Sequence, residues 1–257
     1  MRALITGASS GIGRDMARVL AAKGYDLVLV ARRRERLEEL KKELPVTVDI
    51  LSYDLGSSEN CYELYREAGE IDVLINNAGF GAFGDFLEAD LEEDLQMLRV
   101  NCQAMHMLMK LYLHDFVKRD RGYILNVASA AAFMPGGPLL TVYYATKAYI
   151  LNLTRGVRKE LKKQKSHVVV SALCPGPVQT EFEAVAGVDF ASVGLKSEKV
   201  ARYAISGLFR GKGVLVPGVI FKIARFITRL LPDCVMLSAA YIIQAPRRRR
   251  VEGKKHD

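Results

Sequence analysis

A tyrosine and a lysine four residues apart have the types and spacing needed for proton transfer. Tyr143 and Lys147 lie in a segment with helical periodicity, so we expect both side chains to project from one helix face. A free tyrosine has a pKa of about 10, which is too high for efficient proton transfer near neutral pH. A neighbouring ammonium favours the phenolate, so we expect Lys147 to lower the pKa of Tyr143. Ser129, upstream of this pair, would donate a hydrogen bond to a substrate oxygen and position it.

A glycine-rich turn near the first residues is suited to binding a dinucleotide. The turn reads Thr6-Gly7-Ala8-Ser9-Ser10-Gly11-Ile12-Gly13, after a short apolar run and before a helical pattern. Glycines let the backbone approach a pyrophosphate, and the helix N-terminus points free N–H groups at its oxygens. Ser9 and Ser10 would contact phosphate or ribose, although a turn-forming role would explain them equally well.

The second apolar run ends in arginines, where folds that use NAD usually carry an acidic residue. This run reads Leu29-Val30-Ala31-Arg32-Arg33-Arg34. Arg32 lies 19 positions after Gly13, where it could grip a 2′-phosphate through charge-assisted hydrogen bonds. Alternatively these arginines merely begin a charged helix, as we expect of Arg34 and Arg36. The pattern predicts a preference for NADP(H), with Arg32 as the contact.

Five motifs in order resemble the short-chain dehydrogenase/reductase family over residues 1–218. They are Thr6-Gly7-x-x-x-Gly11-Ile12-Gly13, Asp54-Leu55, Asn76-Asn77-Ala78-Gly79, Tyr143-x-x-x-Lys147 with Ser129 upstream, and Pro175-Gly176 with Thr180. The resemblance implies that Lys147 also holds the nicotinamide ribose. It further implies that Asn101 supports a water chain reaching the lysine, although an ordinary helix asparagine is the alternative. The cofactor would supply the hydride while the protein aligns it and handles the proton.

The same resemblance implies a set of residues that bind the cofactor. Asp54 would contact the adenine ring, and Asn76 would tie neighbouring strands together. Val178 and Thr180 would hydrogen-bond the nicotinamide carboxamide. The complete predicted cofactor set is Gly7, Ser9, Ser10, Gly11, Ile12, Gly13, Arg32, Asp54, Leu55, Asn77, Ala78, Gly79, Tyr143, Lys147, Pro175, Gly176, Val178 and Thr180. The predicted catalytic set is Asn101, Ser129, Tyr143 and Lys147.

The elements that must position these residues are short apolar runs alternating with longer helical patterns. The runs cover residues 3–6, 26–31, 47–50, 72–76, 123–127 and 168–173, without the polar alternation of a half-solvated sheet. Such runs are typical of strands buried on both faces of a parallel sheet. Helical patterns cover residues 12–23, 35–44, 58–68, 91–118 and 144–163. The order predicts an α/β fold of the Rossmann type: one domain with a doubly wound parallel sheet and helices on both faces.

Loops beyond the strand ends are expected to form an apolar substrate pocket, because ligands bind there in such sheets. Residues 80–83, 133–138 and 180–194 are rich in aromatic residues and poor in charge. We expect Phe80, Phe133 and Phe182 to contact the substrate, although several aromatic residues could simply belong to the core. Glycines at positions 136, 137, 187 and 194, in the second and third of these loops, indicate a mobile lid.

The last forty residues depart from the minimal pattern of the family. Residues 219–231 form a basic amphipathic pattern, and residues 235–244 form a second apolar segment. We expect residues 219–245 to pack on the domain as a lid, with a subunit contact or a peripheral membrane contact as alternatives. Residues 246–257 are strongly basic and are expected to form a disordered, solvated tail. Because no aromatic residues interleave with its arginines, we expect no nucleic acid partner.

The composition is that of a globular protein, with 50% hydrophobic and 26% charged residues and a net charge of +8. It excludes wholesale disorder and fibrous repeats. The four cysteines show no metal-ligand spacing, so we expect no metal. The sequence opens without a basic-then-apolar leader, and its longest late uncharged stretch is shorter than the roughly 20 residues of a membrane span. We therefore expect a reducing, cytoplasmic location.

Together these features predict an NADP(H)-dependent oxidoreductase acting on CH–OH donors. It would interconvert a hydrophobic ketone and a secondary alcohol, with Tyr143 as acid and base. A hydroxysteroid-like substrate is favoured, and a 3-ketoacyl or general carbonyl reductase is the alternative. From a different class comes a non-catalytic sensor that binds NADP. The family resemblance also implies a homodimer or homotetramer.

Overall fold

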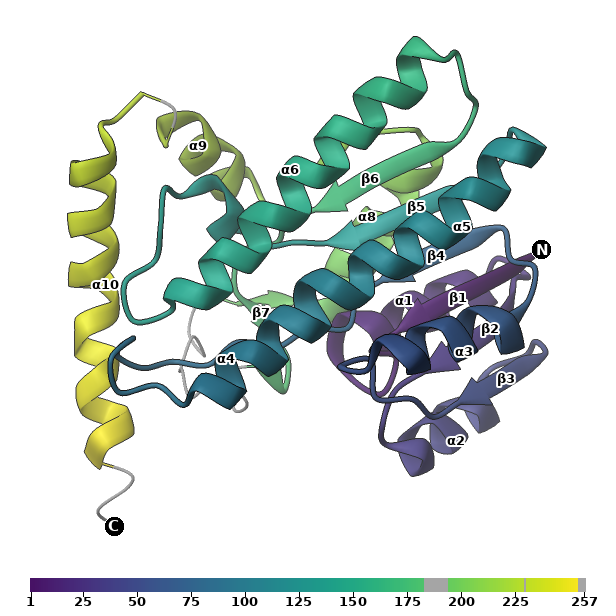
Figure 1. Cartoon of the computed structure of the whole chain (residues 1–257), viewed down its shortest axis with the longest axis horizontal. Helices are drawn as coiled ribbons and strands as arrows, with labels where there is room; N and C mark the ends of the chain where they lie inside the picture. The colour runs from purple at the N-terminus through teal and green to yellow at the C-terminus, as the bar shows by residue number, and fades with distance from the viewer. Residues whose placement is uncertain (183–193, 229, 254–257) are drawn as a thin grey trace.

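The computed structural model describes residues 1–182, 194–228 and 230–253. At its centre is a seven-stranded sheet in the order β3-β2-β1-β4-β5-β6-β9, with every neighbouring pair parallel (Figure 1). The strands are β1 (Arg2–Thr6), β2 (Asp26–Val30), β3 (Val48–Leu51), β4 (Val73–Asn76), β5 (Tyr123–Val127), β6 (Val169–Leu173) and β9 (Val214–Leu215). Two short strands, β7 (Val178–Gln179) and β8 (Leu195–Lys196), pair separately.

Helices cover both faces of the sheet, which confirms the predicted doubly wound, three-layer, Rossmann-type fold. One face carries α1 (Gly11–Ala21), α2 (Arg34–Glu43) and α8 (Ser197–Phe209). The other carries α3 (Ser58–Ala68), α4 (Leu91–Leu98), α5 (Met105–Arg119) and α6 (Thr141–Lys163). The six longer strands and their helices match the sequence prediction to within a few residues, whereas α8 and the strands β7, β8 and β9 were not predicted.

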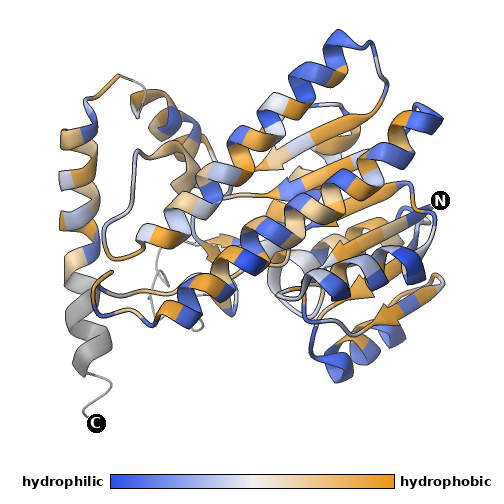
Figure 2. Cartoon of the chain, in the orientation of Figure 1, coloured by the Kyte–Doolittle hydropathy of each residue, from blue (hydrophilic) through white to orange (hydrophobic). Residues whose placement is uncertain are grey.

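The core explains why the strands lack polar alternation. Leu4 and Val28 belong to the hydrophobic cluster under α3, α5 and α6, whereas Ala3, Ile5 and Leu27 belong to the cluster under α1, α2 and α8. All five side chains are fully buried. Because successive strand residues point to opposite faces, both faces of a covered sheet require apolar residues. Figure 2 shows the resulting hydrophobic strands.

The expected single helix over residues 91–118 is interrupted. A π-helical segment, Arg99–Ala104, joins α4 to α5, and it contains the fully buried Asn101. A π-helical turn inserts a residue into the helical repeat and thereby re-aims the neighbouring side chains. No proline or glycine lies within this segment, so the sequence carried no breaker signal for it.

The chain reverses its direction of winding between β1 and β4. It first builds β1, β2 and β3 outward, and then returns to place β4 on the other side of β1. The loops at the carboxyl ends of these central strands therefore diverge and leave a crevice, which is where doubly wound sheets bind ligands. Every predicted motif of the sequence lies at this edge.

Two further helices, α9 (Val219–Ile227) and α10 (Asp233–Gly253), extend from one side of the domain (Figure 1). The helical backbone of α10 runs through Gly253, so residues 246–253 do not form the disordered tail that we expected. None of the helices in the described ranges is long and apolar enough to cross a membrane.

Candidate active site

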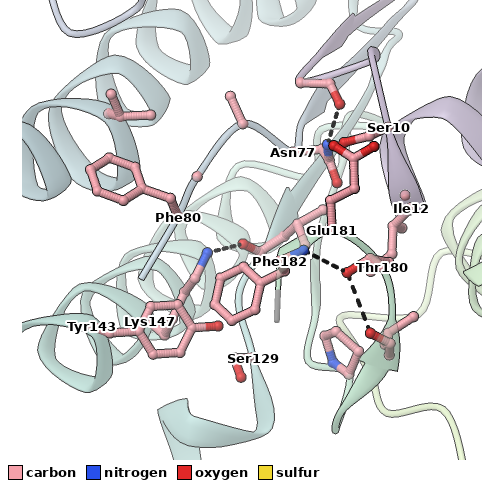
Figure 3. A pocket seen from close by; sticks show the side chains of 18 of the residues that line it. Ser10, Ile12, Asn77, Phe80, Ser129, Tyr143, Lys147, Thr180, Glu181 and Phe182 are labelled. Carbon is pink, nitrogen blue, oxygen red and sulfur yellow. Dashed lines mark hydrogen bonds between the residues drawn. The ribbon is translucent and has the colours of Figure 1, made fainter. Parts of the chain in front are cut away.

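A cavity of about 510 Å³ lies along the carboxyl ends of the central strands (Figure 3). All but three of the predicted site residues line it. The exceptions are Gly13, Asn101 and Phe133. The cavity therefore brings together residues that are far apart in the chain, as the motifs predicted. Its wall also contains Arg33, Tyr53, Tyr144 and Glu181, which sequence reasoning did not assign to the site.

The glycine-rich turn forms one wall because its backbone requires glycine. Gly7 and Gly11 have φ angles of +65° and +53°, in the left-handed region that favours glycine. Gly13 is needed for a different reason, since a Cβ there would lie 2.4 Å from both Gly7 O and Asn77 Nδ2. Gly13 thus supports the turn from behind instead of lining the cavity. The resulting cradle leaves the N-terminus of α1 open toward the cavity.

Hydrogen bonds between β1 and β4 hold this turn in place. The Thr6 hydroxyl accepts from the backbone N–H groups of Asn77 and Ala78, at 2.9 and 3.0 Å. Asn77 Nδ2 donates to the carbonyl oxygens of Thr6 and Gly7. Asn76 reaches the opposite neighbour, as expected, and donates to Asn126 Oδ1 on β5 at 2.9 Å. The asparagine pair therefore fixes the spacing of the three strands under the cavity.

The outer end of the cavity is lined by arginine, serine and a carboxylate. Arg33 Nη2 donates to Ser9 Oγ at 3.2 Å and to Ser10 Oγ at 3.3 Å. Arg33 Nη1 also binds the Glu181 carboxylate at 2.9 Å, and Arg36 pairs with the same carboxylate. Hydrogen bonds from Arg36 and Arg33 hold the pKa of Glu181 below its usual value. Glu181 lies beside Ser10 in Figure 3 and shows where an anion is stabilised.

The predicted cation, Arg32, shares this wall of the cavity with its neighbour Arg33. Arg32 lines the cavity, but Arg33 makes the contacts with the two serines. The reason is local: β2 ends at Val30 and α2 begins at Arg34, so Arg33 is the residue that precedes the helix. The glycine cradle and the arginines beside it fit a dinucleotide cofactor.

The inner end of the cavity gathers the proposed proton-transfer groups. Lys147 is 4% exposed, and its Nζ donates to the carbonyl oxygen of Val127 at 3.1 Å. The same Nζ lies 5.6 Å from the ring centroid of Tyr143, one turn earlier on α6. Ser129, which caps the 3₁₀ turn Ala130–Phe133, lies near enough to Tyr143 to lower the pKa of its phenol. The three groups converge from β5 and α6, as their spacing predicted.

The electrostatics of this pair differ from our expectation. Burial raises the pKa of Tyr143 to about 12, and the hydrogen bond with Ser129 opposes this only in part. Burial also lowers the pKa of Lys147 to about 8. Loss of hydration disfavours both charged forms, the phenolate and the ammonium. Burial therefore outweighs the influences that lower the pKa of Tyr143, and Lys147 is not among the causes of the shift.

Asn101 acts behind the cavity wall. Its Oδ1 accepts from the backbone N–H of Phe80 at 3.0 Å, and its Nδ2 donates to Phe80 O at 2.8 Å and to Thr146 Oγ1 at 3.1 Å. Thr146 immediately precedes Lys147. Asn101 thus ties the loop after β4 to α6, and its contacts assign it a positioning role.

The substrate end contains only two of the three predicted aromatic residues. Phe80 and Phe182 line the cavity, and the Phe182 ring centroid lies 5.4 Å from that of Tyr143. Phe133 lies outside the lining, where the Arg225 guanidinium sits 5.1 Å from its ring. The expected lid falls largely on residues 183–193, which lie outside the described residues.

Tyr144 belongs to the same end, although we expected it only to pack. It lines the cavity, and its hydroxyl accepts from Gln244 Nε2 of α10 at 3.3 Å. A Cβ at Gly137 would lie 2.3 Å from the Tyr144 ring, so this glycine allows the ring its place. Its position next to Tyr143 was the available sequence signal, but helical spacing alone assigned it no partner.

Comparisons with known proteins agree with this geometry. The family model described as short chain dehydrogenase matches residues 1–188. The chain is 32% identical over 200 residues to a very-long-chain 3-oxoacyl-CoA reductase from Anas platyrhynchos, which covers 73% of this chain and 63% of that protein. The chain thus spans less than two thirds of the length of that relative.

Two solved structures are also similar. A short-chain dehydrogenase from Sphingobium yanoikuyae in complex with NADPH has a TM-score of 0.79 and 32% identity, over 85% of this chain and 88% of that one. The bulky-bulky ketone specific alcohol dehydrogenase from Comamonas testosteroni has a TM-score of 0.74 and 28% identity, over 90% and 95%. With its motifs, cavity and family match, the chain belongs to the short-chain dehydrogenase family of oxidoreductases.

Proposed function

We propose that this protein is an NADP(H)-dependent oxidoreductase that interconverts a bulky hydrophobic ketone and its secondary alcohol. The observation that carries the proposal is the convergence of Ser129, Tyr143 and Lys147 in one cavity. The opposite end of that cavity is an arginine-lined anion site. A sensor that only binds the nucleotide would not need this serine, tyrosine and lysine to converge.

The nicotinamide cofactor supplies or accepts the hydride when it is bound. Tyr143 holds the proton at its hydroxyl, because a pKa of about 12 keeps the phenol protonated at neutral pH. It donates that proton to the carbonyl oxygen as reduction proceeds, and it must be deprotonated for the reverse reaction. Ser129 donates a hydrogen bond to the same oxygen and fixes its orientation. Ketone reduction is the direction that we propose, driven by cellular NADPH, with the protonated phenol as the acid.

We place the 2′-phosphate of NADP(H) against Arg33, with Arg32 on the same wall. Arg33 already binds one anion, the Glu181 carboxylate, and reaches the serines of the glycine-rich turn. A planar guanidinium binds phosphate through charge-assisted hydrogen bonds. The similar dehydrogenase from Sphingobium yanoikuyae was solved with NADPH, which supports the same choice here.

The substrate is proposed from the chemistry of the inner end. Phe80, Phe182 and Tyr144 give it an aromatic wall suited to an apolar ketone. A hydroxysteroid-like substrate is the first candidate. A 3-ketoacyl substrate is the second, favoured by the similarity to a 3-oxoacyl-CoA reductase. We also propose a homo-oligomer in the cytoplasm, a reducing compartment that agrees with the four free thiols.

A spectrophotometric screen tests the function. The purified protein is mixed with NADPH or NADH and with a ketosteroid, a 3-ketoacyl thioester, a bulky aryl ketone or acetone. We expect NADPH oxidation with at least one bulky ketone, a higher kcat/KM with NADPH than with NADH, and little turnover of acetone. NADPH binding without oxidation in the presence of any carbonyl compound would favour the sensor and refute the enzyme.

A further inference from the structure

The α9 helix presents its apolar side outward. Five of its side chains are between 43% and 70% exposed, and none of its residues is buried. These five are Val219, Ile220, Ile223, Phe226 and Ile227. An amphipathic surface helix normally turns such a stripe toward the core. In α9 this stripe is turned away from the domain.

The side of α9 that carries Arg225 instead faces the domain. Phe221, Arg225 and Thr228 are its partly buried positions, at the spacing of one helical face. The Arg225 guanidinium lies over the Phe133 ring, and Lys222 Nζ lies 5.8 Å from the ring centroid of Tyr203. These cation–aromatic contacts hold this side inward. The outward apolar side is therefore fixed by specific contacts.

The α10 helix repeats this arrangement. Ala240 and Gln244 are its buried residues among those described, and Gln244 bonds to Tyr144 of the domain. Its large exposed apolar residues are Val235, Leu237, Tyr241, Ile242 and Ile243. Leu230 and Leu231, between the two helices, are exposed as well. We call the exposed apolar residues of α9, α10 and this connection, taken together, the C-terminal apolar face. Figure 2 shows that both helices are rich in hydrophobic residues.

The charges next to this face indicate what covers it. Residues 244–253, which follow Ile243 in α10, contain four basic and one acidic residue. The helical backbone of α10 continues through a run of four arginines, Arg247 to Arg250. At 1.5 Å per residue this run begins only about 6 Å beyond Ile243. An apolar face with a polybasic run beside it provides the two signals that hold a protein on an anionic bilayer. A symmetric pair of chains would instead bring like-charged basic rims together.

We propose that the C-terminal apolar face binds the surface of an anionic lipid bilayer, with α9 and α10 lying in the interface. The exposed isoleucine, phenylalanine and leucine side chains enter the boundary between headgroups and acyl chains. The arginines that follow Ile243 bind the headgroup phosphates. This proposal concerns a surface outside the catalytic cavity, so it stands or falls independently of the reaction.

Vesicle co-sedimentation with the full-length protein tests the proposal. The vesicles are phosphatidylcholine alone, or phosphatidylcholine with about one third phosphatidylglycerol, at low and at high salt. The variant is Ile223→Ser with Phe226→Ser, two outward positions whose loss removes apolar contact but no contact with the domain. The matched control is Tyr62→Ser with Val117→Ser, two exposed apolar positions on α3 and α5. Thermal unfolding by circular dichroism verifies that both variants remain folded.

The wild type and the control are expected to pellet with the anionic vesicles, and less at high salt because salt screens the arginines. The double variant is expected to bind at least about tenfold more weakly. A variant with Arg247→Ser, Arg248→Ser, Arg249→Ser and Arg250→Ser should bind anionic vesicles more weakly. Its weak binding to neutral vesicles should be unchanged. The proposal is overturned if the wild type pellets no more than it does without vesicles. It is equally overturned if Ile223→Ser with Phe226→Ser converts a dimer into a monomer without altering vesicle binding.

Discussion

The two ends of the cavity use opposite electrostatic designs. At the outer end, Arg33, Arg36 and Glu181 are exposed ion-paired groups that remain charged in water. At the inner end, burial around Tyr143 and Lys147 disfavours charge and moves both pKa values toward the neutral forms. The outer end can therefore recognise a charged ligand by exchanging partners. The inner end can keep one proton in place until a reaction needs it.

Removing the proton donor gives the largest effect that we expect. Tyr143→Phe deletes the hydroxyl, so kcat for ketone reduction should fall by about 10²- to 10⁴-fold, the usual contribution of a positioned acid. The Kd for NADPH should stay within about twofold, because the anion site is at the other end. Stopped-flow turnover and fluorescence titration measure the two quantities. Tyr144→Phe is the matched control, and equal losses in both variants would remove the special role of Tyr143.

Removing the Arg33 guanidinium at the outer end of the cavity should weaken cofactor binding and leave the chemical step intact. Arg33→Ala loses charge-assisted hydrogen bonds, which contribute about 1.5–3 kcal/mol, so the KM for NADPH should rise about 10- to 100-fold. The KM for NADH should change little. Arg34→Ala is the control, because Arg34 pairs with Glu38 on α2 and lies outside the cavity lining. If the preference for NADPH were lost in Arg32→Ala and kept in Arg33→Ala, our choice of arginine would be wrong.

The pH profile tests the inner end. Below a pKa of about 8 Lys147 carries its charge, and above it the ammonium is lost, whereas Tyr143 stays protonated to about pH 12. The ammonium is the form of Lys147 that we expect to hold the nicotinamide ribose. The kcat/KM for reduction should therefore fall by about tenfold per pH unit above pH 8. In Lys147→Arg this alkaline limb should disappear, because arginine stays charged. A profile that is flat through pH 9.5 in the wild type would contradict the assignment.

The smallest effect concerns the carboxylate that occupies the anion site. Glu181→Gln removes a competitor of the cofactor phosphate at Arg33 and Arg36. Exposed ion pairs contribute only about 0–1 kcal/mol, so the affinity for NADPH should rise by no more than about fivefold. Isothermal titration with NADPH and NADH measures the change. An equal gain for NADH would show that Glu181 does not compete with the additional phosphate.

Much of the fold was predictable because the strands are buried on both faces and the helices are amphipathic. The β9 strand escaped prediction because two residues are too short to show a period. The break around Asn101 escaped it because a π-helical turn leaves no composition signal. The outward orientation of the apolar side of α9 could not be predicted either. Periodicity shows that a helix has two sides, but not which side meets the domain.

The candidate site was predictable where a motif fixes geometry by spacing. Tyr143 and Lys147 share a helix face because they are four residues apart, and the glycines at 7 and 11 need positive φ angles. The choice between Arg32 and Arg33 depended on where β2 ends and α2 begins, to the precision of one residue. The pKa of Tyr143 depended on burial by residues that come from many parts of the chain. Burial by residues that are distant in the sequence leaves no signature in a local motif.

The division of labour between the two ends is tested most directly by a single-turnover measurement. The rate of NADPH oxidation by a bulky ketone is recorded at saturating NADPH in the wild type, Arg33→Ala, Tyr143→Phe and the double variant. Saturation offsets the weaker binding of Arg33→Ala, so we predict a wild-type rate for it and a rate slowed by about 10²-fold or more for both tyrosine variants. An Arg33→Ala rate as slow as that of Tyr143→Phe would contradict the account.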